Sequence, residues 1–137
     1  MKKLLKISTV ALVLLGFLAT SCEKEKAAPP APAPMAMEAT TNFTPKGETK
    51  SKGVKGNLDG ERGVAYYIVP KLTVCNCNGV WTYDIKAPKN TNYNKEHDKK
   101  TGTLGFMTMS GGTYTITLTY TCPDGSSVSV TVTITVK

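Results

Sequence analysis

Four cysteines have the most reactive side chains of this sequence, and their positions suggest more than one chemistry. They are Cys22, Cys75, Cys77 and Cys122. A thiolate is a nucleophile and a metal ligand, and two thiols in an oxidising compartment form a disulfide. Cys22 lies three residues after the end of an apolar segment, whereas the other three lie among residues that favour strands. The two groups therefore need separate explanations.

Cys75 and Cys77 form a candidate thiol or metal pair, because one intervening residue places both side chains on the same face of a strand. Redox pairs usually lie at the N-terminus of a helix, which stabilises the thiolate, and no helical period surrounds these two residues. A zinc site needs four ligands, and His97 is the only histidine. We expect no metal and no cofactor, and a thiol-active accessory protein is the second alternative function.

A disulfide is the expected state of the three later cysteines in an oxidising compartment. Cys122 would pair with Cys75 or Cys77, and either bond would close a loop of about 45 residues and stabilise the fold by roughly 3–4 kcal/mol. Both partners remain open, although we favour Cys75 because Cys77 adjoins the Asn-Gly turn at residues 78–79.

His97 is the other residue with catalytic potential, and it lies between Glu96 and Asp98 in a lysine-rich segment. We expect this segment, residues 86–101, to be an exposed loop. General acid–base catalysis needs titratable groups that converge in a cleft. The sequence also has no serine in a nucleophile elbow and no phosphate-binding glycine loop. We expect a protein that is not an enzyme.

Trp81 and Tyr83 alternate with polar residues and so lie on one face of an expected strand. If that face points outward, the two rings form a candidate platform on which a sugar could stack. If it points inward, they belong to the core. A small carbohydrate-binding module is therefore the first alternative function.

Residues 1–21 have the composition of an export signal. Lys2, Lys3 and Lys6 precede an apolar stretch at residues 7–19, and small residues follow it. At about 1.5 Å per residue this stretch is too short to span a bilayer core of roughly 30 Å. A signal peptide that is removed explains the segment better than a permanent membrane helix does.

Residues 18–22, Leu-Ala-Thr-Ser-Cys, resemble the lipobox of bacterial lipoproteins, with Ala19 where leucine is usual. The charged stretch at residues 23–26, Glu-Lys-Glu-Lys, is similar to that of lipoproteins of the Bacteroidetes group. The resemblance implies cleavage before Cys22, acylation of its sulfur by palmitate-type chains, and an outer-membrane location on the periplasmic or the cell-surface face. Acyl chains contribute about 0.8 kcal/mol per buried methylene, which anchors a protein that has no membrane helix.

We expect residues 22–63 to be the lipidated cysteine and a disordered, Pro/Ala-rich tether. Residues 27–34 alternate alanine and proline and favour an extended polyproline spacer. The chain has 17 basic and 10 acidic residues, but three lysines leave with the signal, so 14 remain against 10 and the mature charge is +4. Five of the remaining basic residues, Lys46, Lys50, Lys52, Lys55 and Arg62, lie in one stretch of the tether, which could contact polysaccharide or lipid. Basic and aromatic residues are not interleaved, so we expect no nucleic-acid partner.

Residues 64–137 are the expected folded domain. Strand-like runs occupy residues 64–69, 72–77, 80–85 and 104–109, and the last two runs, 114–122 and 128–136, alternate strictly between apolar and hydroxyl residues. A period of two predicts half-buried antiparallel strands. Several short strands with turns between them predict an all-β chain with a small antiparallel β-sandwich.

Residues 112–118, Gly-Thr-Tyr-Thr-Ile-Thr-Leu, and the Val/Thr hairpin that follows resemble the C-terminal half of PKD and related immunoglobulin-like domains of bacterial surface proteins. The resemblance covers only the end of the chain. It implies a sandwich that serves as a spacer or as an interaction module for protein or carbohydrate. With the lipobox, it implies a membrane-anchored, non-catalytic binding or structural module of the cell envelope. Its expected partners are the membrane, through the lipid, and an envelope protein or polysaccharide.

Overall fold

The computed structural model describes residues 35–73 and 77–137, which form an all-β domain without a helix. The signal segment, Cys22 and Cys75 lie outside the described residues. The strands are β1 (Met37–Phe43), β2 (Lys52–Lys55), β3 (Leu58–Gly60), β4 (Ala65–Leu72), β5 (Val80–Lys86), β6 (Tyr93–His97), β7 (Leu104–Thr108), β8 (Gly112–Thr121) and β9 (Ser127–Val136).

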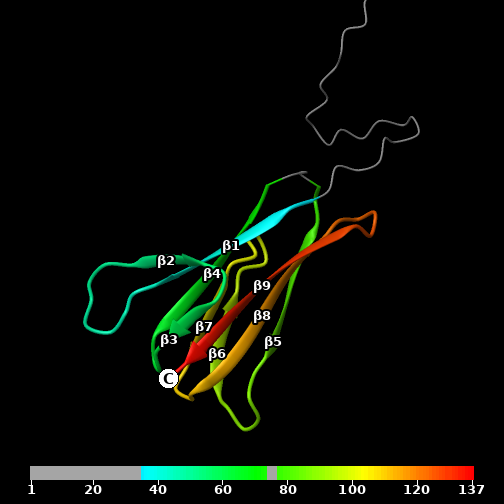
Figure 1. Ribbon diagram of the computed structural model, residues 1–137. Coiled ribbons are helices and arrows are strands. Elements are labelled where there is room, and N and C mark those ends of the chain that lie inside the picture. Colours follow the sequence, from blue (N-terminus) through cyan, green and yellow to red (C-terminus); the bar gives the residue numbers. More distant parts are fainter. Residues whose placement is uncertain (1–34, 74–76) are drawn as a thin grey trace, which may run out of the picture.

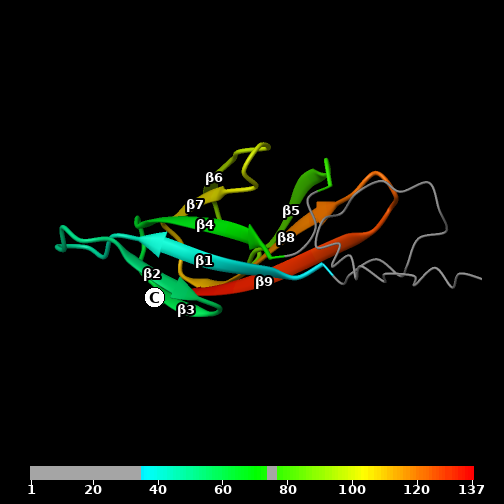
Figure 2. The ribbon, with the colours of Figure 1, turned by 90° about the horizontal axis from the view of Figure 1, so that it is seen from above.

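The strands form two sheets packed face to face (Figures 1 and 2). One sheet has the order β2-β1-β4-β7-β6 and the other β3-β9-β8-β5. The expected small sandwich is confirmed, although the pair β3 and β9 is parallel rather than antiparallel. Immunoglobulin-type sandwiches place strands A, B, E and D in one sheet and C, F and G in the other. Strands β1, β4, β7 and β6 take the first arrangement here, and β5, β8 and β9 take the second.

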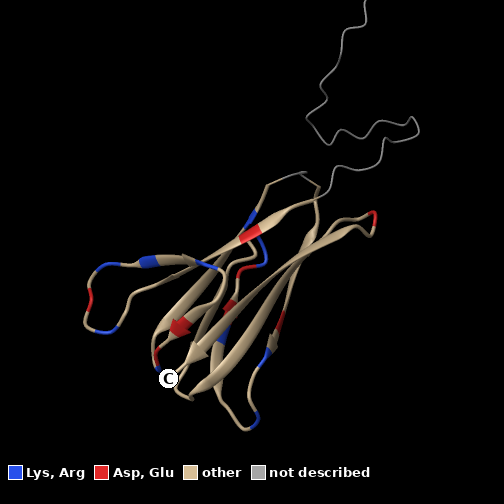
Figure 3. Ribbon diagram, viewed as in Figure 1, with Lys and Arg blue, Asp and Glu red and all other residues tan. Residues whose placement is uncertain are grey.

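The hairpin of β8 and β9 was predicted correctly. Ten residue pairs join the two strands, from Gly112 opposite Val136 to Thr121 opposite Ser127. Apolar side chains on one face are buried, apart from the half-buried Val128 and Val130, while threonine and serine cover the other face. Neither strand has a charged residue (Figure 3). Thr117 and Thr131 hydroxyls pair across the strands at 3.1 Å, as do Thr119 and Ser129 at 2.7 Å. The hydroxyl face is thus partly satisfied within the sheet.

The sandwich begins at Met37, so the expectation of a tether up to residue 63 is wrong from that residue onward. All seven residues of β1 pair with β4 in the interior of a sheet. Ala39 and Thr41 of β1 are buried, and Phe43 packs on Tyr66 with ring centroids 5.3 Å apart. Small and polar residues occupy these core positions, so the apolar alternation that identifies a strand is missing from this segment.

The segment expected to be a loop at residues 86–101 contains strand β6, which pairs with β7 over its full length. Its residues are mostly polar because it is the edge of its sheet, where charged side chains protect against pairing with another chain. Pro70 also lies inside β4 rather than ending it. Strand β7 pairs only with residues 65–68 of β4. Pro70 lies beyond this pairing, so the sheet loses no hydrogen bond because proline lacks an N–H group.

The core lies between the sheets and is built from the inward faces of the longer strands. Phe106 of β7 packs on Tyr114 of β8 at 5.1 Å between ring centroids. The Tyr114 hydroxyl is satisfied by the Ser110 carbonyl at 3.0 Å and by Thr108 Oγ1 at 3.1 Å. The fully buried large side chains are Tyr66, Ile68, Leu104, Phe106, Tyr114, Ile116, Leu118, Val132 and Ile134.

Candidate functional site

The disulfide joins Cys77 to Cys122, with their Cα atoms 5.9 Å apart. The preference for Cys75 was therefore wrong. Val80 lies opposite Thr121 in the pairing of β5 and β8, which brings the segment before β5 next to the residue that follows β8. The Asn-Gly pair at residues 78–79 does not prevent the bond; the Gly79 N–H donates a hydrogen bond to the Cys77 carbonyl at 2.9 Å. This bond removes two of the three thiols that a thiol-active protein would use.

Trp81 and Tyr83 point between the sheets rather than outward. They lie opposite Tyr120 and Leu118, which are buried, and residues opposite each other in an antiparallel pair share a face. The Trp81 ring packs on the Tyr120 ring at 4.7 Å between centroids. It also covers Gly102, where an added Cβ would lie 2.3 Å from the indole. Both aromatic rings belong to the packing at the edge of the core, so they do not form the candidate sugar platform.

The Tyr120 hydroxyl links the disulfide segment to the four-stranded sheet. It donates a hydrogen bond to the Cys77 carbonyl and accepts one from the Gly79 N–H at 2.7 Å. Gly79 is needed here, since an added Cβ would lie 2.5 Å from the Thr121 carbonyl oxygen. One aromatic side chain thus fixes the short segment that contains the cysteine.

Glu96, His97 and Asp98 do not converge on a common site. Strand alternation turns Glu96 to the outer face and His97 inward, where its ring lies 4.8 Å from the Tyr83 ring. Burial lowers the pKa of His97, although Asp98 acts in the opposite direction. Asp98 turns into its own loop and accepts hydrogen bonds from the Lys100 N–H at 2.9 Å and the Thr101 hydroxyl at 2.8 Å, which lower its pKa. The three side chains therefore lack the geometry of an acid–base pair.

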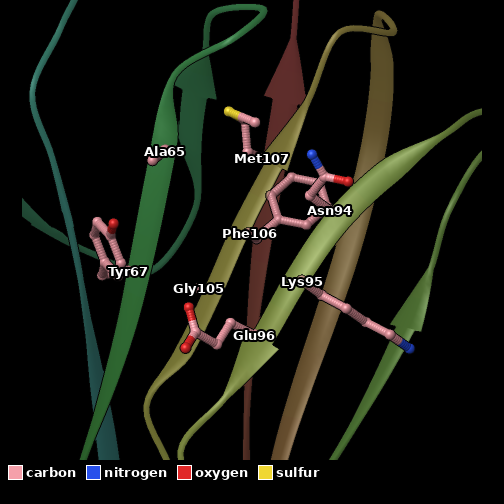
Figure 4. A pocket seen from close by; sticks show the side chains of 8 residues that line it. All are labelled: Ala65, Tyr67, Asn94, Lys95, Glu96, Gly105, Phe106 and Met107. Carbon is pink, nitrogen blue, oxygen red and sulfur yellow. The ribbon is translucent and has the colours of Figure 1, made fainter.

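A shallow groove lies on the outer face of the five-stranded sheet, around the exposed ring of Tyr67 (Figure 4). One hollow of about 350 Å³ lies over β4, β7 and β6, and a second of about 170 Å³ continues over β1 and the β1–β2 connection. We call the two together the Tyr67 groove, because both share Ala65 and Tyr67. Its lining residues are Asn42, Phe43, Thr44, Ser51, Ala65, Tyr67, Asn94, Lys95, Glu96, Gly105, Phe106 and Met107.

One row of residues crosses all five strands along this groove. In register from edge to edge it runs Gly53, Asn42, Tyr67, Gly105 and Glu96. Tyr67 is 52% exposed and stands between two shorter neighbours. Lys95 points the other way, with its ammonium 5.0 Å from the centre of the Tyr83 ring. Along this row the outer face thus presents one aromatic ring, with the amide of Asn42 on one side and the carboxylate of Glu96 on the other.

The sequence did not reveal this groove. Tyr67 follows Tyr66 inside an apolar run, and such a run does not indicate which ring faces outward. Asn42 and Asn94 stood in segments expected to be a tether and a loop. The one available signal was Gly105 inside a short apolar strand, since a strand glycine often marks a site that another molecule approaches closely.

The described residues contain no group of three His, Cys, Asp or Glu side chains placed to hold a metal ion. No helix long and apolar enough to cross a membrane occurs in residues 35–73 and 77–137. A comparison of the sequence with protein-family models gave no match. A search of curated proteins likewise gave no match.

Proposed function

We propose that the protein is a lipid-anchored, non-catalytic binding module of the bacterial cell envelope. The observation that supports a binding role is the Tyr67 groove, an exposed hollow built on neighbouring strands of one sheet. A site on paired strands is held more rigidly than one on loops, which favours recognition of a ligand. The anchor rests on the lipobox-like sequence that ends in Cys22 and on the apolar segment before it.

The position of the chain entry is compatible with anchoring. Met35, the first described residue, places its sulfur 3.5 Å from Cys122 Sγ, at the end of the sandwich that contains the disulfide. Strand β1 then runs away from that end to the β1–β2 hairpin at the other (Figure 1). The groove lies along the side of the domain between these two ends, where a lipid attached at Cys22 would leave it accessible.

The anchor is tested by producing the protein and a Cys22→Ala variant in a bacterial host that is fed an alkyne analogue of palmitate. We expect the label on the parent protein alone, and we expect the parent in the outer-membrane fraction and the variant in soluble extracts. Protease added to intact cells then distinguishes the cell-surface face from the periplasmic face. A Cys22→Ala variant that stays in the membrane fraction would contradict the proposal.

A further inference from the structure

The floor of the Tyr67 groove belongs to interior strands, and this restricts how a ligand can bind. Strands β4 and β7 each have neighbours on both sides, so their backbone N–H and C=O groups are used in the sheet ladders. Peptides that bind β-proteins commonly add a strand to a free sheet edge. Of the strands that line the groove only β6, at one side, is an edge strand; β4 and β7 under its centre offer no free edge, so side chains must do the recognition around Tyr67.

The side chains of the groove suit the two kinds of surface that a sugar ring presents. A pyranose has an apolar C–H face and a rim of hydroxyl groups. The Tyr67 ring offers a flat, electron-rich face for the first. For the second, Asn42, Asn94 and Glu96 are exposed and offer amide and carboxylate groups that exchange hydrogen bonds with hydroxyls. A few polar groups around an apolar contact are typical of ligand sites.

Gly105 strengthens the argument, because neither the backbone nor the packing requires glycine there. Its φ is not in the left-handed region, and an added Cβ would lie 3.6 Å from the Tyr67 ring and from the Glu96 carbonyl oxygen, an ordinary contact distance. A glycine inside a strand weakens it. Its effect here is to leave the floor beside Tyr67 open.

The length and charge of the groove indicate which class of glycan would fit it. Neighbouring strands lie about 4.8 Å apart, so the five-residue row extends over about 19 Å, enough for several sugar units. Among the described residues that line the groove only Lys95 and Glu96 are charged, and Lys95 points to the other face. Outside the groove on the same sheet, Glu38 of β1 and Lys55 of β2 form an ion pair at 2.7 Å. A groove whose outward charge is a single carboxylate disfavours an acidic polysaccharide.

We infer that the Tyr67 groove binds a neutral polysaccharide strand, with one sugar ring stacked on Tyr67 over Gly105 and its neighbours hydrogen-bonded to Asn42 on one side and to Asn94 and Glu96 on the other. The inference rests on the proposed binding role. It is independent of the lipid anchor, which the Cys22→Ala fractionation tests separately.

The experiment uses the full chain, solubilised in a polyoxyethylene detergent because a detergent with a sugar headgroup would compete. Binding is measured by biolayer interferometry on immobilised neutral polysaccharides (glucomannan, xyloglucan, arabinoxylan, α-mannan and dextran) and on acidic ones (alginate and polygalacturonate). Two variants change the groove: Tyr67→Ala removes the stacking ring, and Gly105→Val fills the floor. Thr82→Val introduces the same residue type, valine, at an exposed position of β5 in the other sheet and is the matched control.

We expect binding to at least one neutral polysaccharide, weakened at least tenfold by Tyr67→Ala and by Gly105→Val and unchanged by Thr82→Val. Gly105→Val separates loss of a site from loss of the fold, since valine favours strands and the variant is expected to melt at or above the parent temperature. Binding to none of the neutral polysaccharides would overturn the inference. So would stronger binding to the acidic ones, or equal affinity in the parent and the Tyr67→Ala variant.

Discussion

The disulfide between Cys77 and Cys122 is expected to supply a large part of the stability of this domain. Its two residues are 45 positions apart in the sequence. Closing a loop of about that length reduces the entropy of the unfolded chain by an amount equivalent to about 4 kcal/mol at 25 °C. Natural domains are stable by only about 5–15 kcal/mol in total. The sandwich should therefore be marginal without the bond.

The perturbation is the double substitution Cys77→Ala and Cys122→Ala, followed by urea unfolding with intrinsic Trp81 fluorescence as the signal. We expect the free energy of unfolding to fall by about 4 kcal/mol relative to the oxidised parent. For a domain of about 100 residues, this corresponds to a melting temperature lower by roughly 15–30 °C. The parent protein treated with a reductant is the matched control and should unfold like the variant.

A loss below about 1 kcal/mol in the double variant, with the same urea dependence, would refute the argument from loop closure. It would mean that the unfolded chain is already restricted near these residues, or that the bond does not form in the folded protein. Counting free thiols in the parent protein distinguishes the two explanations.

Three further predictions concern single side chains. Tyr120→Phe removes the hydroxyl that bonds to the Cys77 carbonyl and the Gly79 N–H, so urea unfolding should show a loss of about 1–3 kcal/mol; an unchanged midpoint would contradict it. Thr41→Val should stabilise the protein by about 1 kcal/mol, since the buried Thr41 hydroxyl has no hydrogen-bond partner among the described residues, and a lower melting temperature would contradict this. Burial lowers the pKa of His97 in the folded state, so the unfolded chain takes up the proton first and stability should fall as pH drops below about 6.5. Urea midpoints at pH 7.5 and 5.5 should differ less in His97→Gln than in the parent protein, and equal differences would refute the assignment.

Strands were predicted correctly from the sequence where apolar residues occupy one face and hydroxyl residues the other, because the period of two is then easy to recognise. Strands β8 and β9 alternate valine, isoleucine, leucine or tyrosine with threonine or serine, so both the hairpin and its buried face followed from the pattern. Strand β1 was missed because Thr41 fills a core position that an apolar residue usually occupies. Strand β6 was missed because an edge strand needs little apolar surface and is mostly polar.

The candidate site was less predictable because its residues come from separate parts of the chain. Asn42, Tyr67 and Gly105 become neighbours only through the pairing of β1, β4 and β7, and no local pattern encodes that pairing. The bond of Cys77 to Cys122 likewise joins residues 45 positions apart, which no local pattern specifies. Trp81 and Tyr83 were correctly placed on one face, but only the two-sheet arrangement decides that this face is the inner one.

The central claim, that this sandwich is tethered by lipid on one cysteine, is tested most directly by mass spectrometry of the N-terminal peptide of the mature protein. The account predicts a peptide that begins at Cys22 and has the added mass of a diacylglyceryl group, with or without a third acyl chain. A mature N-terminus at any other residue, or an unmodified thiol at Cys22, would contradict it.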